Sequence, residues 1–249
     1  MTTLMQASRV APVDAIEDTP GWLCHRWFSY RAFTLVSLRD PWHTGRLPKR
    51  SIRYDTAVGK SMRLRQAILI LSTLLASWLG MQAVHELGHV LAAGITGGRV
   101  ARVVLHPLTI SRTDVAENPH PLLVVWAGPI CGVLLPLLLW ACVSRFKPNA
   151  AFLPRFFAGF CLLANGLYIS IGSLDRVGDC GEMLKHGSPV WLLWGFGLLT
   201  VPCGLWLWHG QGARFGWGSS PNEVNQTVTV ASLIIACTLL AFSLFIGGR

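Results

Sequence analysis

One stretch of the chain constrains its fold most strongly, because residues 66–84 contain no charged side chain over 19 positions. A helix of that length and apolarity can cross the hydrocarbon core of a bilayer. A short polar interruption at His85, Glu86 and His89 follows, and the apolar run then resumes at Val90. The sequence therefore predicts a membrane-spanning helix that carries ionisable groups inside it.

The composition extends this prediction to the whole chain. Of its 249 residues, 52% are hydrophobic and 13% are charged, whereas soluble domains are about 25% charged. Because four more apolar segments of about 20 residues follow the first, we expect a mainly α, polytopic transmembrane bundle embedded in a lipid bilayer. The predicted spans are residues 66–96, 120–144, 151–173, 189–209 and 227–246.

The chain divides by composition into three regions, which are a basic, aromatic-containing extension (1–65), a membrane core (66–187) and C-terminal transmembrane helices (188–249). The extension carries 11 Lys or Arg against 5 Asp or Glu, which favours a cytoplasmic N-terminus by the positive-inside rule. Since no nucleic-acid-binding motif accompanies this charge, we interpret it as membrane-surface and topological charge and expect no nucleic-acid partner.

The polar interruption reads His85-Glu86-Leu87-Gly88-His89. On a helix the two histidines lie one turn apart on one face, so both imidazoles can bind one Zn²⁺ while Glu86 takes a proton from metal-bound water. An ionisable group at a helix centre in lipid costs about 2.5–3.5 kcal/mol. A bound divalent cation would offset that cost. The alternative is a structural cluster of polar side chains.

A catalytic zinc site usually has three protein ligands and one open position, so a third donor is needed. Asp179 is favoured, because it lies between Gly178 and Gly181 at a predicted turn that could bend back into the protein. Asp175 is the main alternative. The remaining downstream candidates are Cys180, Glu182 and Glu223.

Two segments have the composition of β-strands. Residues 51–58 alternate in polarity, and residues 100–113 are rich in Val, Leu, Ile and Thr after two glycines. We expect a strand or interfacial segment at the first, and one or two strands at the membrane surface at the second. A strand beside a hydrolase site could hold an extended substrate by edge pairing, and a plain connecting hairpin is the alternative.

These motifs resemble the site-2 protease family of intramembrane zinc metallopeptidases, over about residues 68–187. The pentapeptide at 85–89 with the following Gly97-Gly98 resembles the first zinc helix of the family and its exit. Ala127-Gly128-Pro129 resembles its Gly-Pro-containing helix. The segment from Asn165 to Gly181 resembles the later helix and the turn that supplies the third ligand.

The resemblance implies one Zn²⁺ per chain, held by His85, His89 and Asp179. It also implies that Glu86 is the general base. The family commonly follows its third ligand with glycine, whereas Cys180 follows Asp179 here, so Asp175 stays an alternative. The candidates for substrate binding are Gly128, Pro129 and Asn165.

The leading functional hypothesis is hydrolysis of a peptide bond in or near the transmembrane segment of another membrane protein. The first alternative is a non-proteolytic metalloprotein that acts as an adaptor or regulator, and the intact Glu86 argues against it. The second is a metal transporter, but transport paths usually place ionisable groups on several spans. If the basic extension is cytoplasmic, the 19 uncharged residues before His85 place the site towards the opposite side of the membrane. The resemblance instead implies a zinc ion nearer the cytosol. The predicted orientation follows the charge.

Overall fold

A computed structural model describes residues 56–217 and 224–247 of the chain. The long helices are α1 (Thr56–Ile95), α2 (Pro121–Phe146), α3 (Phe152–Asp175), α5 (Val190–Trp208) and α6 (Gln226–Gly247), and the short elements are β1 (Arg99–Val104), β2 (Arg112–Glu117) and α4 (Asp179–Lys185). All five long helices are long and apolar enough to cross a membrane. The predicted mainly α, polytopic bundle is therefore confirmed.

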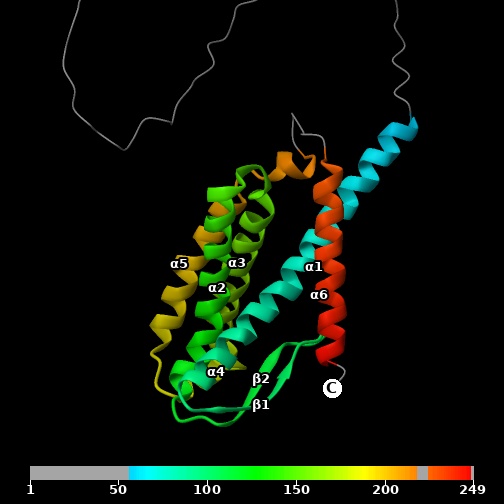
Figure 1. The fold of residues 1–249 in the computed structure, drawn as a ribbon. Coiled ribbons are helices and arrows are strands. Elements are labelled where there is room, and N and C mark those ends of the chain that lie inside the picture. The colour runs from blue at the N-terminus through cyan, green and yellow to red at the C-terminus, as the bar shows by residue number, and fades with distance from the viewer. Residues whose placement is uncertain (1–55, 218–223, 248–249) are drawn as a thin grey trace, which may run out of the picture. The chain divides into compact units, whose positions relative to one another are not determined.

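The long helices form two groups that meet at α1. Figure 1 shows α2, α3 and α5 side by side, with α1 crossing them obliquely and α6 running beside α1. Apolar side chains from three helices fill the first group, among them Val133, Leu162 and Leu207. Between α1 and α6 the contact includes a hydrogen bond of 2.8 Å between the hydroxyls of Ser72 and Ser232. Helix α1 is thus held from both sides.

A two-stranded antiparallel sheet follows α1, as the composition predicts, and Val103 pairs with Thr113 in it. Strand β2 extends beyond the predicted segment 100–113, to Glu117. A turn around Pro107 separates the two strands, because proline has no backbone N–H to donate to the sheet. The hairpin is attached to two helices. The indole of Trp78 on α1 donates to the carbonyl of Pro107 (3.2 Å), and the hydroxyl of Ser243 on α6 donates to that of Leu105 (3.2 Å).

The strand predicted at residues 51–58 is wrong for its last three residues, because α1 begins at Thr56. Residues 56–65 contain good helix formers such as Lys, Arg, Met and Leu, and they continue directly into the apolar span, so the helix propagates through them. The border predicted at residue 65 therefore falls inside α1. The rest of that strand and of the predicted extension lies outside the described residues.

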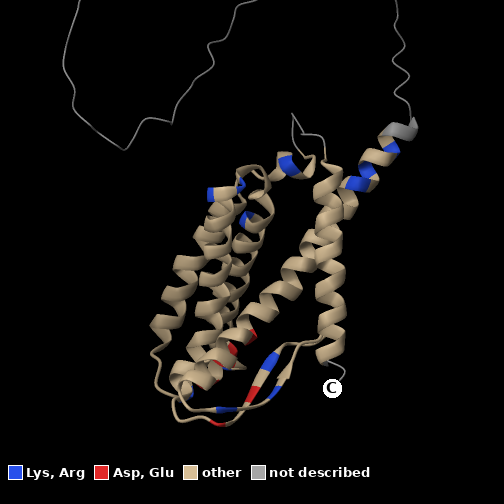
Figure 2. Ribbon diagram, in the orientation of Figure 1, with Lys and Arg blue, Asp and Glu red and all other residues tan. Residues whose placement is uncertain are grey.

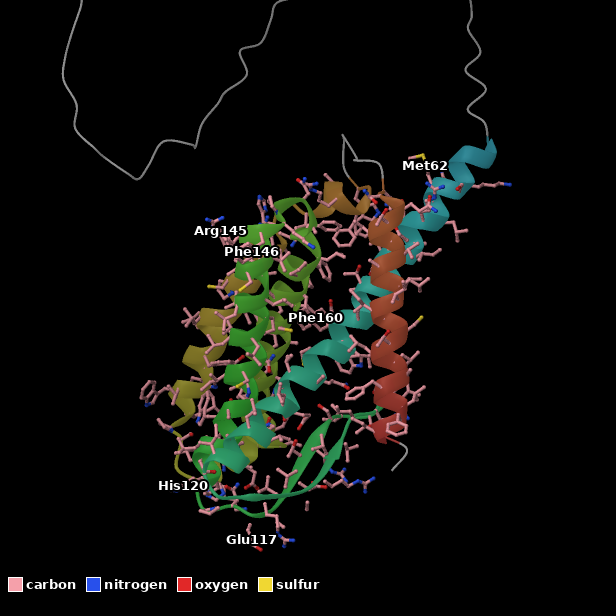
Figure 3. All side chains as sticks on the ribbon, in the orientation of Figure 1. Met62, Glu117, His120, Arg145, Phe146 and Phe160 are labelled. Carbon is pink, nitrogen blue, oxygen red and sulfur yellow. The ribbon has the colours of Figure 1, made fainter. Side chains whose placement is uncertain are left out.

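Among the described residues, acidic side chains are confined to one end of the bundle, whereas basic side chains occur at both ends (Figure 2). Figure 3 shows Met62 and Arg145 towards one end of the bundle, and Glu117 and His120 at the other end, near the hairpin. The first end contains the start of α1, the end of α2, the start of α3 and the loop before α6, with Lys60, Arg63, Arg65, Arg145, Lys147, Arg155 and Arg214. The hairpin end also carries basic residues, namely Arg99, Arg102, Arg112, Arg176 and Lys185. Every Asp and Glu in the described part of the chain belongs to the other half, which contains the hairpin and α4.

Candidate metal centre

The two histidines of the pentapeptide lie in the last third of α1 and are both buried. They are one helical turn apart, so their rings project from the same face of the helix. Their Nε2 atoms are 3.1 Å from each other. The sequence spacing therefore brings two imidazole nitrogens to one point, next to α2 and α3.

Hydrogen bonds on the far side of each ring indicate which nitrogen carries the proton. His85 Nδ1 lies 2.7 Å from the side-chain oxygen of Asn165, and the Asn165 amide nitrogen donates to the carbonyl of Cys161 (2.9 Å). The Asn165 oxygen is thus an acceptor, and His85 Nδ1 donates to it. His89 Nδ1 donates to the carbonyl of Val124 at 2.8 Å. Both rings therefore carry their proton on Nδ1 and present a lone pair at Nε2.

Asp179 is the third member of the centre. Its Oδ2 lies 2.8 Å from His85 Nε2 and 3.5 Å from His89 Nε2. The chain reverses just before it, where Arg176 (φ 55°) and Gly178 (φ 61°) both adopt positive φ. The backbone N–H of Asp179 then donates to the hydroxyl of Tyr168 at 3.1 Å. The predicted turn brings this carboxylate back onto α1, although Asp179 itself is the first residue of α4.

The donor set fits a divalent cation. The His85 and His89 Nε2 atoms are 3.1 Å apart, and Asp179 Oδ2 lies 2.8 Å from the first and 3.5 Å from the second. Two lone pairs and a carboxylate oxygen this close repel one another unless a positive charge lies between them. Ligands about 2.0–2.1 Å from a tetrahedral zinc ion are about 3.3–3.4 Å apart, close to these separations. Cation binding requires the carboxylate to be ionised and both Nε2 atoms to be unprotonated. The Nδ1 hydrogen bonds of the two rings meet the second requirement.

Two glycines allow α1 and α2 to approach at the centre. A Cβ on Gly128 would collide with the imidazole of His89 and lie 2.9 Å from His85 Nε2. A Cβ on Gly88 would lie 2.8 Å from the carbonyl carbon of Ala127. Contacts that short do not occur between real side chains, so both rings can lie against the α2 backbone only because glycine is present. Gly128, a predicted substrate-binding candidate, thus packs on the histidines.

A cavity of about 690 Å³ adjoins the centre. Both histidines and Asp179 line it, as do Glu86 and Thr113. Glu86 is 3% exposed, and its Oε2 accepts a hydrogen bond of 2.7 Å from the hydroxyl of Thr113 on β2. The cavity thus holds a carboxylate, a candidate metal site and space for another molecule.

The other candidate ligands lie apart from the histidines. Asp175 is exposed at the last residue of α3 and does not belong to the group of His85, His89 and Asp179. The Cys180 thiol is buried and donates to the carbonyl of Tyr168 at 3.2 Å. Glu182 is exposed and pairs with Lys185 and His186, and Glu223 lies outside the described residues.

Sequence reasoning missed three groups that surround the centre, namely the hydroxyls of Thr113 and Tyr168 and the carbonyl of Val124. Each comes from a different element and makes its contact through the tertiary fold. Asn165 is a predicted substrate-binding candidate, but its side-chain oxygen and nitrogen are both hydrogen-bonded within the protein, to His85 and to the carbonyl of Cys161. Pro129 is fully buried within α2.

The fold and the site together define a class of multi-pass membrane proteins. In this class a helix with the motif His-Glu-x-x-His and an aspartate from a separate helix meet at one buried centre. Residues 62–170 match the family described as Peptidase M50B-like. This match covers less than half of the chain, and it confirms the predicted resemblance to the site-2 protease family. The matched range contains His85, Glu86, His89 and Asn165 and ends before Asp179. No curated protein and no solved structure matches the chain.

Proposed function

We propose that the chain is an intramembrane zinc metallopeptidase that hydrolyses peptide bonds in or near the transmembrane segments of other membrane proteins. One observation carries the proposal. Two buried Nε2 atoms and a carboxylate oxygen converge within 3.5 Å of one another, beside a second, buried carboxylate in a cavity. Metallopeptidases with the His-Glu-x-x-His motif use these groups.

His85, His89 and Asp179 would hold the zinc ion, and their geometry favours Asp179 over Asp175 as the third ligand. When bound, zinc lowers the pKa of water and polarises a carbonyl oxygen. The Nδ1 bonds to Asn165 and Val124 keep both imidazoles in the tautomer that can bind a cation. The family match supports a metal-dependent peptidase without naming these residues.

Glu86 would act as the general base. It accepts a proton from the attacking water as the new C–O bond forms at the scissile carbonyl. It then passes that proton to the leaving nitrogen as the C–N bond breaks. Its burial and its place on the cavity wall support this role, because proton transfer requires a fixed group within reach of the reacting atoms.

The substrate would enter the cavity as an extended chain, since a helix hides its carbonyls in internal hydrogen bonds. Strand β2 supports this mode, because Thr113 and Val115 line the cavity and the hairpin leaves strand edges that could pair with another chain. A substrate segment that resists unwinding should then be cleaved poorly.

We propose further that the N-terminus is cytoplasmic and that the site lies towards the opposite membrane surface. The distribution of basic residues supports this orientation, because more of those in the described residues lie at the end away from the hairpin than at the hairpin end (Figure 2). Basic residues next to spans prefer the cytoplasmic side. This proposal differs from the resemblance, which implies a zinc nearer the cytosol.

The test compares the parent protein with Glu86→Gln in detergent, with fluorescein-labelled β-casein and single-span reporter proteins as probes. We expect the parent to cleave at least one probe. Glu86→Gln should keep its zinc and lose cleavage by a factor of about 10² or more. A Glu86→Gln protein that still cleaves would contradict the role of the base. Zinc flux in proteoliposomes that His85→Ala abolishes would instead favour a transporter.

A further inference from the structure

Glu86 is tied to a different element of the fold through a single described hydrogen bond. The hydroxyl of Thr113 donates to Glu86 Oε2 at 2.7 Å, from a position 27 residues further along the chain. Within the described residues no partner is found for the other carboxylate oxygen, Oε1. One oxygen is thus held, and the second is left available at the cavity.

The register of the hairpin selects the residue that reaches Glu86. Along β2, Thr113 and Val115 are partly buried, while their neighbours Arg112 and Asp114 are exposed. Because strand side chains alternate between faces, a slip of one residue would turn a charged side chain towards Glu86 in place of the hydroxyl. The pairing of Thr113 with Val103 opposes such a slip, as do the hydrogen bonds that Trp78 and Ser243 donate to the hairpin backbone.

The chemistry of threonine suits the task. A neutral hydroxyl donates one hydrogen bond and orients a carboxylate, whereas an arginine there would form an ion pair and make the carboxylate a weaker base. Threonine is also β-branched, so it fits a strand and has few side-chain rotamers. The hydroxyl is therefore fixed relative to β2, and Glu86 is fixed relative to the hairpin.

We propose that Thr113 is a positioning residue for the proposed peptidase reaction: it holds Glu86 with one oxygen free to accept the proton of the attacking water. The inference rests on the proposed function. It adds that the hairpin, besides lining the cavity, sets the orientation of the base. The base is then correctly placed only when the hairpin is docked on α1.

The experiment compares Thr113→Val, which keeps the shape and removes the hydroxyl, with Thr113→Ser, which keeps the hydroxyl. Thr109→Val is the matched control, because Thr109 is exposed in the same hairpin and does not line the cavity. With the labelled casein or the cleaved reporter, we expect Thr113→Val to lower kcat about 10–100-fold with KM nearly unchanged. Thr113→Ser should recover most of the loss, and Thr109→Val should match the parent.

A second readout needs no turnover. The carboxylate band of Glu86 can be identified in infrared difference spectra as the band that Glu86→Gln removes. We expect this band to shift in Thr113→Val and to keep its parent position in Thr113→Ser. An unshifted band, or a kcat loss that Thr113→Ser does not recover, would overturn the proposal. If the parent cleaves no probe, the proposed function fails, and the band alone decides whether Thr113 holds Glu86.

Discussion

At the scale of single residues, the centre depends on groups that hydrogen-bond to Nδ1 of each histidine, on the side of the ring away from the candidate metal site. Asn165 fixes the tautomer of His85 through a bond of 2.7 Å, and the Val124 carbonyl does the same for His89 at 2.8 Å. Such partners orient a metal ligand and raise its basicity. The affinity for zinc should therefore depend on residues that never contact the ion.

Asn165→Ala tests this dependence. Without the amide acceptor, His85 loses the bond that keeps its proton on Nδ1, so we expect zinc affinity to fall about 10–100-fold in chelator competition. Asn225→Ala is the matched control, because Asn225 is an exposed residue just before α6 and does not line the cavity. Equal affinities in the two variants would contradict the account of His85.

Gly128→Ala tests the close contact between α2 and the rings. The new methyl group would overlap His89, so we expect lost zinc binding and a loss of about 1–3 kcal/mol of stability. Gly94→Ala makes the same change on α1, where a Cβ would meet nothing within 4 Å. It should bind zinc like the parent. Metal content and thermal unfolding of both variants check this, and a Gly128→Ala protein with full zinc content would be inconsistent with the described packing.

At the scale of elements, the turn between α3 and α4 sets the position of Asp179. Arg176 adopts left-handed backbone geometry at the C-cap of α3, and Gly178 has positive φ beside the hydroxyl of Tyr168. A positive φ destabilises a residue that has a Cβ atom by about 1–2 kcal/mol, whereas glycine adopts it without this steric cost. The turn therefore contains one strained position and one well-suited position.

Two substitutions at this turn should have opposite effects. Arg176→Gly relieves the strain at a helix C-cap, so we expect the free energy of unfolding to rise by about 1 kcal/mol. Gly178→Ala introduces strain and a contact with Tyr168, so the same quantity should fall by more than that. Thermal unfolding in detergent measures both. Shifts of the same sign would mean that the turn differs from the one described.

The sequence predicts the elements whose signal is local. The five long helices follow from apolar runs, and His85, Glu86 and His89 follow from helical spacing within one of them. Helix α4 is too short for a periodic pattern, so Asp179 is predicted in a turn rather than at a helix start. The partners Thr113 and Tyr168 meet the centre only through tertiary packing. Spacing in the sequence therefore carries no signal for them.

At the scale of the whole molecule, the larger number of basic residues at the end where α1 begins predicts how the protein lies in the membrane. We test this with single cysteines at Lys147 and Glu117, after replacing the native cysteines by serine. Both residues are exposed, and they lie at opposite ends of the bundle, Lys147 at the C-cap of α2 and Glu117 at the end of β2. On intact cells, an impermeant maleimide should label Glu117→Cys at once and Lys147→Cys only after permeabilisation. The reverse pattern would place the site nearer the cytosol, as the family resemblance implies.

The central claim is that His85, His89 and Asp179 form one zinc site. The most direct measurement is the metal content of the freshly purified parent and of His85→Ala, Asp179→Ala and Asp175→Ala. We predict about one zinc ion per chain in the parent and in Asp175→Ala, and none in the other two variants. A folded parent without metal, or a zinc ion that survives in Asp179→Ala and is lost in Asp175→Ala, would contradict the account.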